Sequence, residues 1–248
     1  MRYLPLLLCL LLAGCMSPYK RVSTHEEPMA DAQLLSRFLD RSGSWESFSC
    51  RVKVRLEIGD TTVSAKGTLL YMSPEKYSLS FVKPYHQVIG DIYVTASQLL
   101  YWGNGKTKYY YSAVDTVRIP ELIPMAFPDW DPRDLLPFPV SGRTAGFQVI
   151  SEQQDSIGQH WIHGDCGTAR HDLRVDPFTG VIRFEQVVRN ATDPVRKFYD
   201  KYYSIQGWPI PARVTCEDTS GRVRMTWSIS QIDLKSPDFT FDESETSQ

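Results

Sequence analysis

The sequence lacks an apolar run long enough to cross a membrane as a helix. Its longest apolar stretch, residues 4–12, is interrupted at Pro5 and falls far short of the roughly 20 residues that a spanning helix needs. An excess of basic charge is also missing, because 27 Lys and Arg are intermixed with 29 Asp and Glu. These two absences argue against a helical membrane protein and against a nucleic-acid partner.

Cysteine is scarce and its spacing matches no known metal or redox motif. Cys9 and Cys15 fall in the N-terminal segment, which leaves Cys50, Cys166 and Cys216 for the folded body. They form neither a zinc knuckle nor a Cys-x-x-Cys pair. Three cysteines allow at most one intramolecular disulfide and one free thiol, and the sequence leaves the pairing open.

Motifs of enzymes are missing as well: there is no Gly-x-Ser-x-Gly elbow, no His-Glu-x-x-His and no phosphate-binding loop. The densest set of reactive side chains comprises His160, His163, Asp165, Cys166, His171 and Asp172. On a strand, His160 and His163 point to opposite faces and cannot chelate together. We interpret the set as polar residues on the outer face of a hairpin. A metal site or a Cys-His nucleophile is the alternative.

A second cluster is acidic and consists of Asp129, Asp131 and Asp134. It resembles the acid and base pair of a glycosidase only superficially. Asp131 precedes a proline and is interpreted as a helix cap, and the other two as solvated loop acids. We therefore expect no enzyme activity, no metal and no cofactor.

The first fourteen residues are typical of a secretory signal, in which Arg2 precedes a short apolar core. Residues 12–15 read Leu-Ala-Gly-Cys, which resembles the lipobox of bacterial lipoproteins. The resemblance implies a diacylglyceryl group on the thiol of Cys15, the first residue of the mature chain. Acyl chains there would hold the protein to membrane lipid without spanning the bilayer.

The segment that follows is expected to be a flexible tether over residues 15–29. It is polar and aperiodic, and it contains Pro18 and Pro28. In some bacterial lipoproteins an aspartate directly after the lipidated cysteine retains the protein at the inner membrane. This chain has Met16 at that position, which under the same rule favours the outer membrane, with the protein facing the periplasm.

Residues 30–41 place Leu34, Leu35 and Phe38 at helical spacing before Gly43, which predicts one N-terminal amphipathic helix. From residue 48 the apolar period becomes two, as expected for strands with one dry face. The predicted strands are 48–58, 62–72, 76–83, 88–96, 98–102, 106–112, 147–154, 158–164, 170–176, 181–189, 195–205, 211–217 and 222–234. Because no helices separate them, they must pair antiparallel in a meandering sheet. The fold class is mainly β (α+β).

Between the two series of strands, residues 118–140 contain six prolines and many apolar side chains. Prolines at this density exclude a central strand and a long helix. Asp131 followed by Pro132 predicts the cap and first residue of one short helical turn. The apolar residues of this segment must be buried, and the segment can cover one face of the sheet together with the N-terminal helix.

Six local patterns, in the same order, resemble the lipoprotein carrier and receptor family, LolA and LolB. They lie at residues 67–79, 100–103, 131–136, 175–182, 208–214 and 237–241. The resemblance implies a single curved antiparallel sheet, a half-barrel of about 11–13 strands, over residues 30–242, with residues 243–248 as a disordered tail. Its concave apolar face, covered by the helix and a mid-chain helical or loop lid, would bind acyl chains.

The candidate acyl-chain residues are those that the pattern places on the dry face and in its cover. They are Leu34, Phe38, Val52, Val54, Leu56, Leu69, Tyr71, Leu79, Phe81, Trp130, Leu135 and Leu136. The sequence does not distinguish an open cavity from a filled core at these positions. The receptor's exposed leucine has no counterpart in residues 82–87. Tyr85 could contact the membrane in its place or simply pack on the turn.

The expected function is that of a lipid-anchored periplasmic binding protein. It would accept acyl chains of lipoproteins or related amphiphiles and pass them to the membrane. The first alternative is a non-catalytic scaffold lipoprotein that binds other envelope proteins through its sheet and has a vestigial cavity. The second alternative is an envelope hydrolase that uses residues 160–172.

Overall fold

The structure is a computed structural model. It describes residues 20–22, 24, 27–30, 33, 34, 36, 37, 47–72, 76–82, 88–94, 99–103, 107–111, 132–139, 147–189, 193–205 and 207–234. The expectations for Cys15, Phe38, Tyr85 and Trp130 fall outside these residues, as do the signal segment and the C-terminal tail.

The described chain forms one antiparallel sheet, and all thirteen predicted strands are present with ends shifted by at most three residues. The strands are β2 (Ser47–Ile58), β3 (Thr61–Met72), β4 (Lys76–Val82), β5 (Val88–Val94), β6 (Leu99–Gly103), β7 (Thr107–Tyr111), β8 (Gln148–Gln154), β9 (His160–Cys166), β10 (Ala169–Val175), β11 (Ile182–Arg189), β12 (Val195–Ile205), β13 (Trp208–Glu217) and β14 (Val223–Asp233). A two-residue strand that was not predicted, β1 (Lys20–Arg21), pairs with β12.

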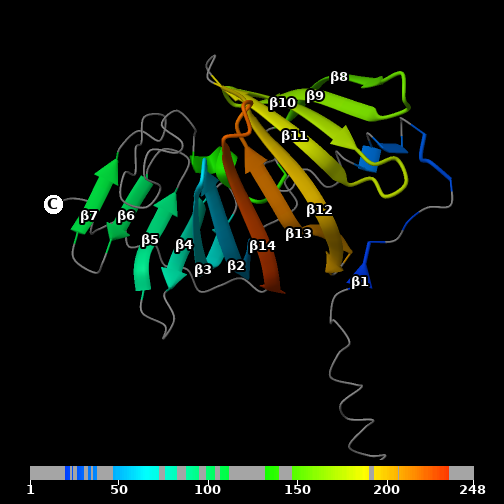
Figure 1. The fold of residues 1–248 in the computed structure, drawn as a ribbon. Helices are drawn as coiled ribbons and strands as arrows, with labels where there is room; N and C mark the ends of the chain where they lie inside the picture. The colour runs from blue at the N-terminus through cyan, green and yellow to red at the C-terminus, as the bar shows by residue number, and fades with distance from the viewer. Residues whose placement is uncertain are drawn as a thin grey trace, which may run out of the picture.

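The strand order is β7-β6-β5-β4-β3-β2-β14-β13-β12-β11-β10-β9-β8. Two meanders are therefore joined in the middle, where the first long strand, β2, pairs with the last, β14. The edge strands of the described sheet, β7 and β8, come from the middle of the chain. Figure 1 shows the sheet curving from β7 to β8 without closing.

One face of the sheet is dry. In β2 the side chains of Cys50, Val52 and Val54 are buried, while Arg51 and Lys53 between them are exposed. A slip of one residue would turn the charged set inward, so the alternation fixes the register. Full burial of each large apolar side chain contributes about 1.5–3 kcal/mol. This buried face lines the inside of the curve.

The mid-chain insertion has to connect the two edges of the sheet. Twelve spacings of about 4.8 Å separate β7 from β8, roughly 58 Å if the sheet were flat. The described part of this insertion, residues 132–139, contains the 3₁₀ helix η2 (Pro132–Leu135). A 3₁₀ turn thus begins at Pro132, where the sequence predicted one short helical turn, while the expected cap, Asp131, lies outside the described residues.

The N-terminal segment is attached to the sheet at two described points. Lys20 and Arg21 pair with Ser204 and Tyr203 of β12, and the backbone N–H of Met29 donates to the carbonyl of Pro177 at 3.0 Å. Part of the segment expected to be a flexible tether is therefore held by backbone hydrogen bonds. Of the predicted helix, residues 33, 34, 36 and 37 are helical.

Cys50, Cys166 and Cys216 are not disulfide-bonded to one another, so none of the pairings that the sequence allowed among them forms. No helix within the described ranges combines the length and apolar character needed to cross a bilayer.

Candidate functional site: the concave face

The described candidate residues come together in a single buried core. Those on the sheet and those that cover it belong to the same cluster, and each is at most 9% exposed. They are Leu34, Val52, Val54, Leu56, Leu69, Tyr71, Leu79, Phe81, Leu135 and Leu136. The pattern of period two thus identified one continuous apolar surface.

Residues 132–139 lie across this surface and contact three separate strands. The Arg189 guanidinium of β11 donates two hydrogen bonds of 3.1 Å to the carboxylate of Asp134. The thiol of Cys216 on β13 lies 3.9 Å from the carbonyl oxygen of Leu135. The Phe138 ring packs edge-on against Phe48 of β2, with 4.7 Å between centroids. The segment therefore bridges β11 and β2 over the inside of the curve.

Asp134 is not the solvated acid that the sequence suggested. Its side chain is 5% exposed because Arg189, on a strand 55 residues away in sequence, reaches it from the sheet. A bidentate pair of this kind is strong and directional. No sequence pattern predicts this partner, because the two residues lie in different elements far apart in the chain.

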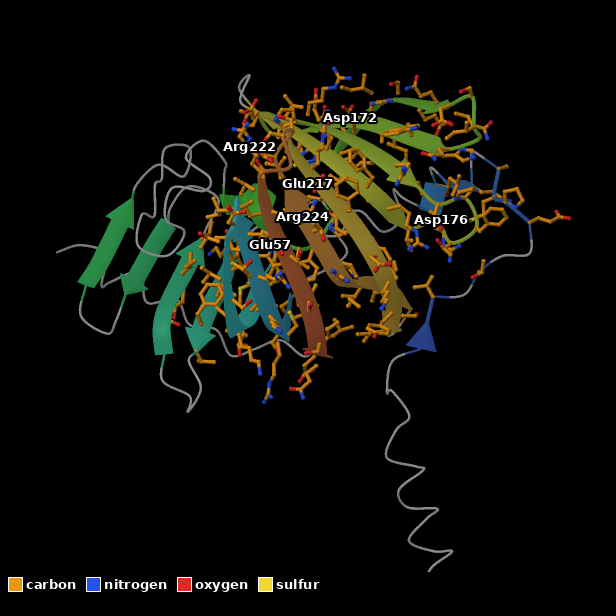
Figure 2. The ribbon with its side chains drawn as sticks, viewed as in Figure 1. Glu57, Asp172, Asp176, Glu217, Arg222 and Arg224 are labelled. Atoms are coloured by element: carbon orange, nitrogen blue, oxygen red, sulfur yellow. The ribbon has the colours of Figure 1, made fainter. Side chains whose placement is uncertain are left out.

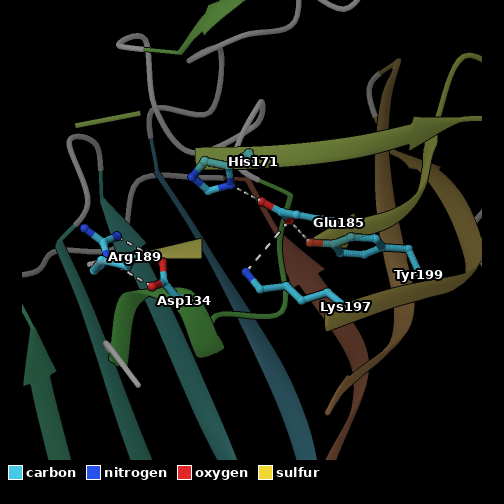
Figure 3. Close-up of polar contacts among 6 residues, drawn as sticks. All are labelled: Asp134, His171, Glu185, Arg189, Lys197 and Tyr199. Carbon is cyan, nitrogen blue, oxygen red and sulfur yellow. Dashed lines mark hydrogen bonds and ion pairs between the residues drawn. The ribbon is translucent and has the colours of Figure 1, made fainter. Parts of the chain in front are cut away.

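Four polar side chains interrupt the apolar face between β10 and β12 (Figure 3). Glu185 accepts from His171 Nδ1 at 2.8 Å and from the Tyr199 hydroxyl, and its Oε2 lies 3.8 Å from Lys197 Nζ. Glu185 and Lys197 face each other in the register of β11 and β12 and are both fully buried. Burial, followed by the charge of Glu185, raises the pKa of Tyr199 well above its usual range. Tyr199 therefore stays protonated and acts as a donor.

This polar group corrects the interpretation of residues 160–172. His171 is on the inner face and 2% exposed, because β10 alternates Ala169, His171 and Leu173 toward the core. His163 and Asp172 do lie on the outer face, where Nδ1 and Oδ1 are 2.6 Å apart. The set is split between the two faces of the sheet and cannot act as one catalytic cluster.

Strand parity could have revealed the inner polar residues. Lys197 lies between Val195 and Tyr199 on the same face of β12, and Glu185 lies two residues before Val187 on β11. Charged residues at inward positions are rare unless paired, so two of them on neighbouring strands indicate a buried pair. Within the part of the chain that the structure describes, no three His, Cys, Asp or Glu side chains could hold a metal ion.

Two further features shape the dry face. The indole Nε1 of Trp227, on β14, is buried with no hydrogen-bond partner among the described residues. Burial without a charged partner raises the pKa of the Cys50 thiol to about 12, so this thiol is inert near neutrality. Among the described residues of this face, the Trp227 indole is thus a buried donor without a hydrogen-bond partner.

The fold matches solved structures of low sequence similarity. A LolA superfamily protein from Nitrosomonas europaea superimposes with a TM-score of 0.58 at 13% identity, covering 85% of this chain and 97% of that protein. A Vibrio parahaemolyticus domain described as an outer membrane lipoprotein-sorting protein gives 0.58 at 9% identity, covering 87% and 95%. A DUF1329 family protein from Desulfovibrio piger gives 0.57 at 10%, covering 86% and 96%.

No family model and no curated protein sequence matches the chain. The similarity therefore concerns architecture: the fold is LolA/LolB-like, as the six local patterns predicted.

Proposed function

We propose that this chain is a lipid-anchored binding protein of the bacterial envelope, held to the outer membrane through Cys15. It accepts acyl chains of lipoproteins or related amphiphiles on the concave face and passes them to the membrane. The observation that carries the proposal is the continuous apolar face of a LolA/LolB-like sheet covered by a segment of the same chain. No chemistry is required, because burial of each methylene contributes about 0.8 kcal/mol.

Residues 132–139 would act as the cover that cargo displaces. Leu135, Leu136 and Phe138 occupy the apolar surface that acyl chains would take. Their polar attachments to the sheet are the Asp134 pair with Arg189 and the thiol contact of Cys216. The buried N–H of Trp227 could then donate to an ester carbonyl of the cargo, because an unpaired buried donor costs about 1–3 kcal/mol.

The first experiment looks for the cargo. The chain with Cys15→Ala is purified from a bacterial envelope fraction without detergent and analysed by native mass spectrometry. We expect acylated molecules that remain bound in the folded state and are released on unfolding. A protein that carries no lipid and takes none up from vesicles contradicts the proposal.

The second experiment tests the cover through the thiol beneath it. Asp134→Asn removes the carboxylate charge that pairs with Arg189, so residues 132–139 should detach from the sheet more often. The Cys216 thiol, which contacts Leu135, should then be alkylated faster. Glu217→Gln is the matched control, because it removes a carboxylate paired with Arg224 on the outer face (Figure 2). We expect Asp134→Asn alone to accelerate both alkylation and lipid exchange.

The alternative is a scaffold lipoprotein that binds envelope proteins and no lipid. The burial of the concave face favours it, because the described candidate residues are at most 9% exposed. It predicts stable protein partners in a pull-down with the Cys15→Ala chain and an alkylation rate at Cys216 that vesicles do not change.

A further inference from the structure

Two hairpin turns of the sheet are built in the same way. Between β8 and β9, Asp155 accepts the backbone N–H groups of Ile157 and Gln159 at 3.0 and 2.8 Å. Between β10 and β11, Asp176 accepts those of Phe178 and Thr179 at 2.9 and 3.2 Å. Each turn is completed by a glycine with positive φ, at positions 158 and 180. In both turns an aspartate fixes the residue two positions later.

The residue that each turn presents is apolar and exposed. Ile157 is 76% exposed and Phe178 is 41% exposed. A single exposed apolar side chain is common, but apolar side chains that gather in one exposed patch mark a contact surface. The aspartates also hold the turns rigid near neutrality. Backbone and indole hydrogen bonds hold the pKa of Asp155 below its usual range, and the pKa of Asp176 is lowered too.

Both turns lie at the end of the sheet where the N-terminal segment is attached. His160 pairs with Val175, so the two turns project side by side beyond the sheet, about two strand spacings or roughly 10 Å apart. The N–H of Met29 bonds to the second turn at Pro177. β1 pairs with the end of β12 at the same side of the molecule (Figures 1 and 2).

We propose that this end of the sheet is a membrane-contact surface and that Ile157 and Phe178 insert into the interface of the bilayer. The inference rests on the lipid anchor at Cys15 proposed above. Cys15 precedes Lys20 by five residues, which span at most about 18 Å, so the anchor keeps β1 near the lipid. Apolar side chains of surface-bound proteins enter the headgroup and acyl boundary to about 5–10 Å.

The opposite end of the sheet provides the internal control. Val63 is 54% exposed and shares a register row with Leu56, Met225, Cys216 and Lys197. That row meets β12 at Lys197, whereas β1 pairs with β12 at Tyr203, six residues further on. The row of Val63 therefore lies about 20 Å from β1 along the strand direction. β4 and β5 also end on that side, at Val82 and Val88, so the turn that contains Tyr85 begins and ends away from the anchor.

The test measures the depth of a spin label in the membrane. Ile157→Cys, Phe178→Cys and Val63→Cys are made singly in the full chain with Cys166→Ser, because Cys50 and Cys216 are buried. Each variant is labelled with a nitroxide and reconstituted in vesicles of phosphatidylethanolamine and phosphatidylglycerol. Collision rates with oxygen and with a water-soluble nickel complex are compared. Mass spectrometry of the same preparation determines whether Cys15 carries lipid.

We expect the oxygen-to-nickel collision ratio at positions 157 and 178 to rise several-fold on reconstitution and the ratio at 63 to stay at its aqueous value. Lipidated protein with three equally aqueous labels would overturn the contact surface and leave the anchor intact. Protein that carries no lipid at Cys15 would overturn the anchor and this inference with it. A deep label at 63 would show that the opposite end faces the bilayer and would also overturn the inference.

Discussion

Glu185 illustrates how the molecule keeps charge inside an apolar face. Its carboxylate accepts hydrogen bonds from His171 and Tyr199 and forms an ion pair with Lys197, and these partners lie on the two neighbouring strands. Burying an ion is expensive, and only close partners and hydrogen bonds compensate for it. The sequence pattern treats charged residues as outward-facing, and for this reason the group was not predicted even though the strands carrying it were.

The first prediction concerns this carboxylate. Glu185→Gln leaves the buried Lys197 ammonium without the nearest compensating charge, so the free energy of unfolding should fall by roughly 3–5 kcal/mol. Glu217→Gln, at a partly exposed pair, should cost less than about 1 kcal/mol. Urea unfolding measures both. If Glu185→Gln with Lys197→Met is no more stable than Glu185→Gln alone, the ion pair does not account for the loss.

The second prediction concerns acid and the turn at Asp176. Burial raises its pKa, but the Arg183 hydrogen bond and charge and the backbone N–H groups of Phe178 and Thr179 outweigh it and hold the pKa below 3.8. A lowered pKa in the folded state means that the carboxylate stabilises the protein above about pH 4, and that this stability is lost as the pH falls through the folded value.

Asp176→Asn should therefore destabilise the protein by about 1 kcal/mol at pH 7, a modest figure because Arg183 is partly exposed. The difference from the unsubstituted chain should shrink below pH 4. Urea unfolding at pH 7 and pH 3 measures it. A difference that is constant across this range would show that the charge of Asp176 contributes nothing.

Among the strands, β9 has a glycine that allows its neighbour to approach. A Cβ on Gly164 would lie 2.5 Å from both the Gln148 carbonyl oxygen and the Phe147 ring. That ring packs against His171, with 6.0 Å between centroids. Gly164 thus leaves room for Phe147, the residue directly before β8, to pack over His171 of the buried polar group.

The third prediction follows from this approach. Gly164→Ala should destabilise the protein by about 1–3 kcal/mol, because backbone and ring must both shift. Gly167→Ala is the control: its φ is +60° but nothing lies within 4 Å, so only backbone strain of about 1 kcal/mol is expected. Thermal and urea unfolding distinguish the two. Equal losses would mean that close packing at position 164 is unimportant.

Strand positions and the pairing of consecutive strands could be predicted, whereas the pairing of β2 with β14 could not. The period of two located the ends of β2, β11 and β12 to within one residue, because side-chain alternation is local. The pairing of β2 with β14 depends on no local pattern, and neither does the contact of Asp134 with Arg189. β1 is only two residues long, too short to show a period.

For the whole molecule, the pairing of β2 with β14 places the first and the last long strand at the centre of the sheet. The strands most distant in sequence support each other, while the edges β7 and β8 come from the middle of the chain. The insertion between these edges must therefore run from one edge of the sheet to the other, and its described part, residues 132–139, lies on the concave face. The topology thus makes a cover over the proposed binding surface possible.

The fourth prediction is a gradient of stability across the sheet. Amides of β2 and β14 lie between long neighbours and should exchange only on global unfolding, whereas β8, whose side chains are mostly exposed, should exchange by local opening. Hydrogen exchange with mass spectrometry measures this order. If residues 132–139 are a movable cover, they should exchange faster than β13 beneath them, and Asp134→Asn should accelerate that region alone. Protection at residues 132–139 equal to that of β14 would mean that the segment is a fixed part of the core, which favours the scaffold over the carrier.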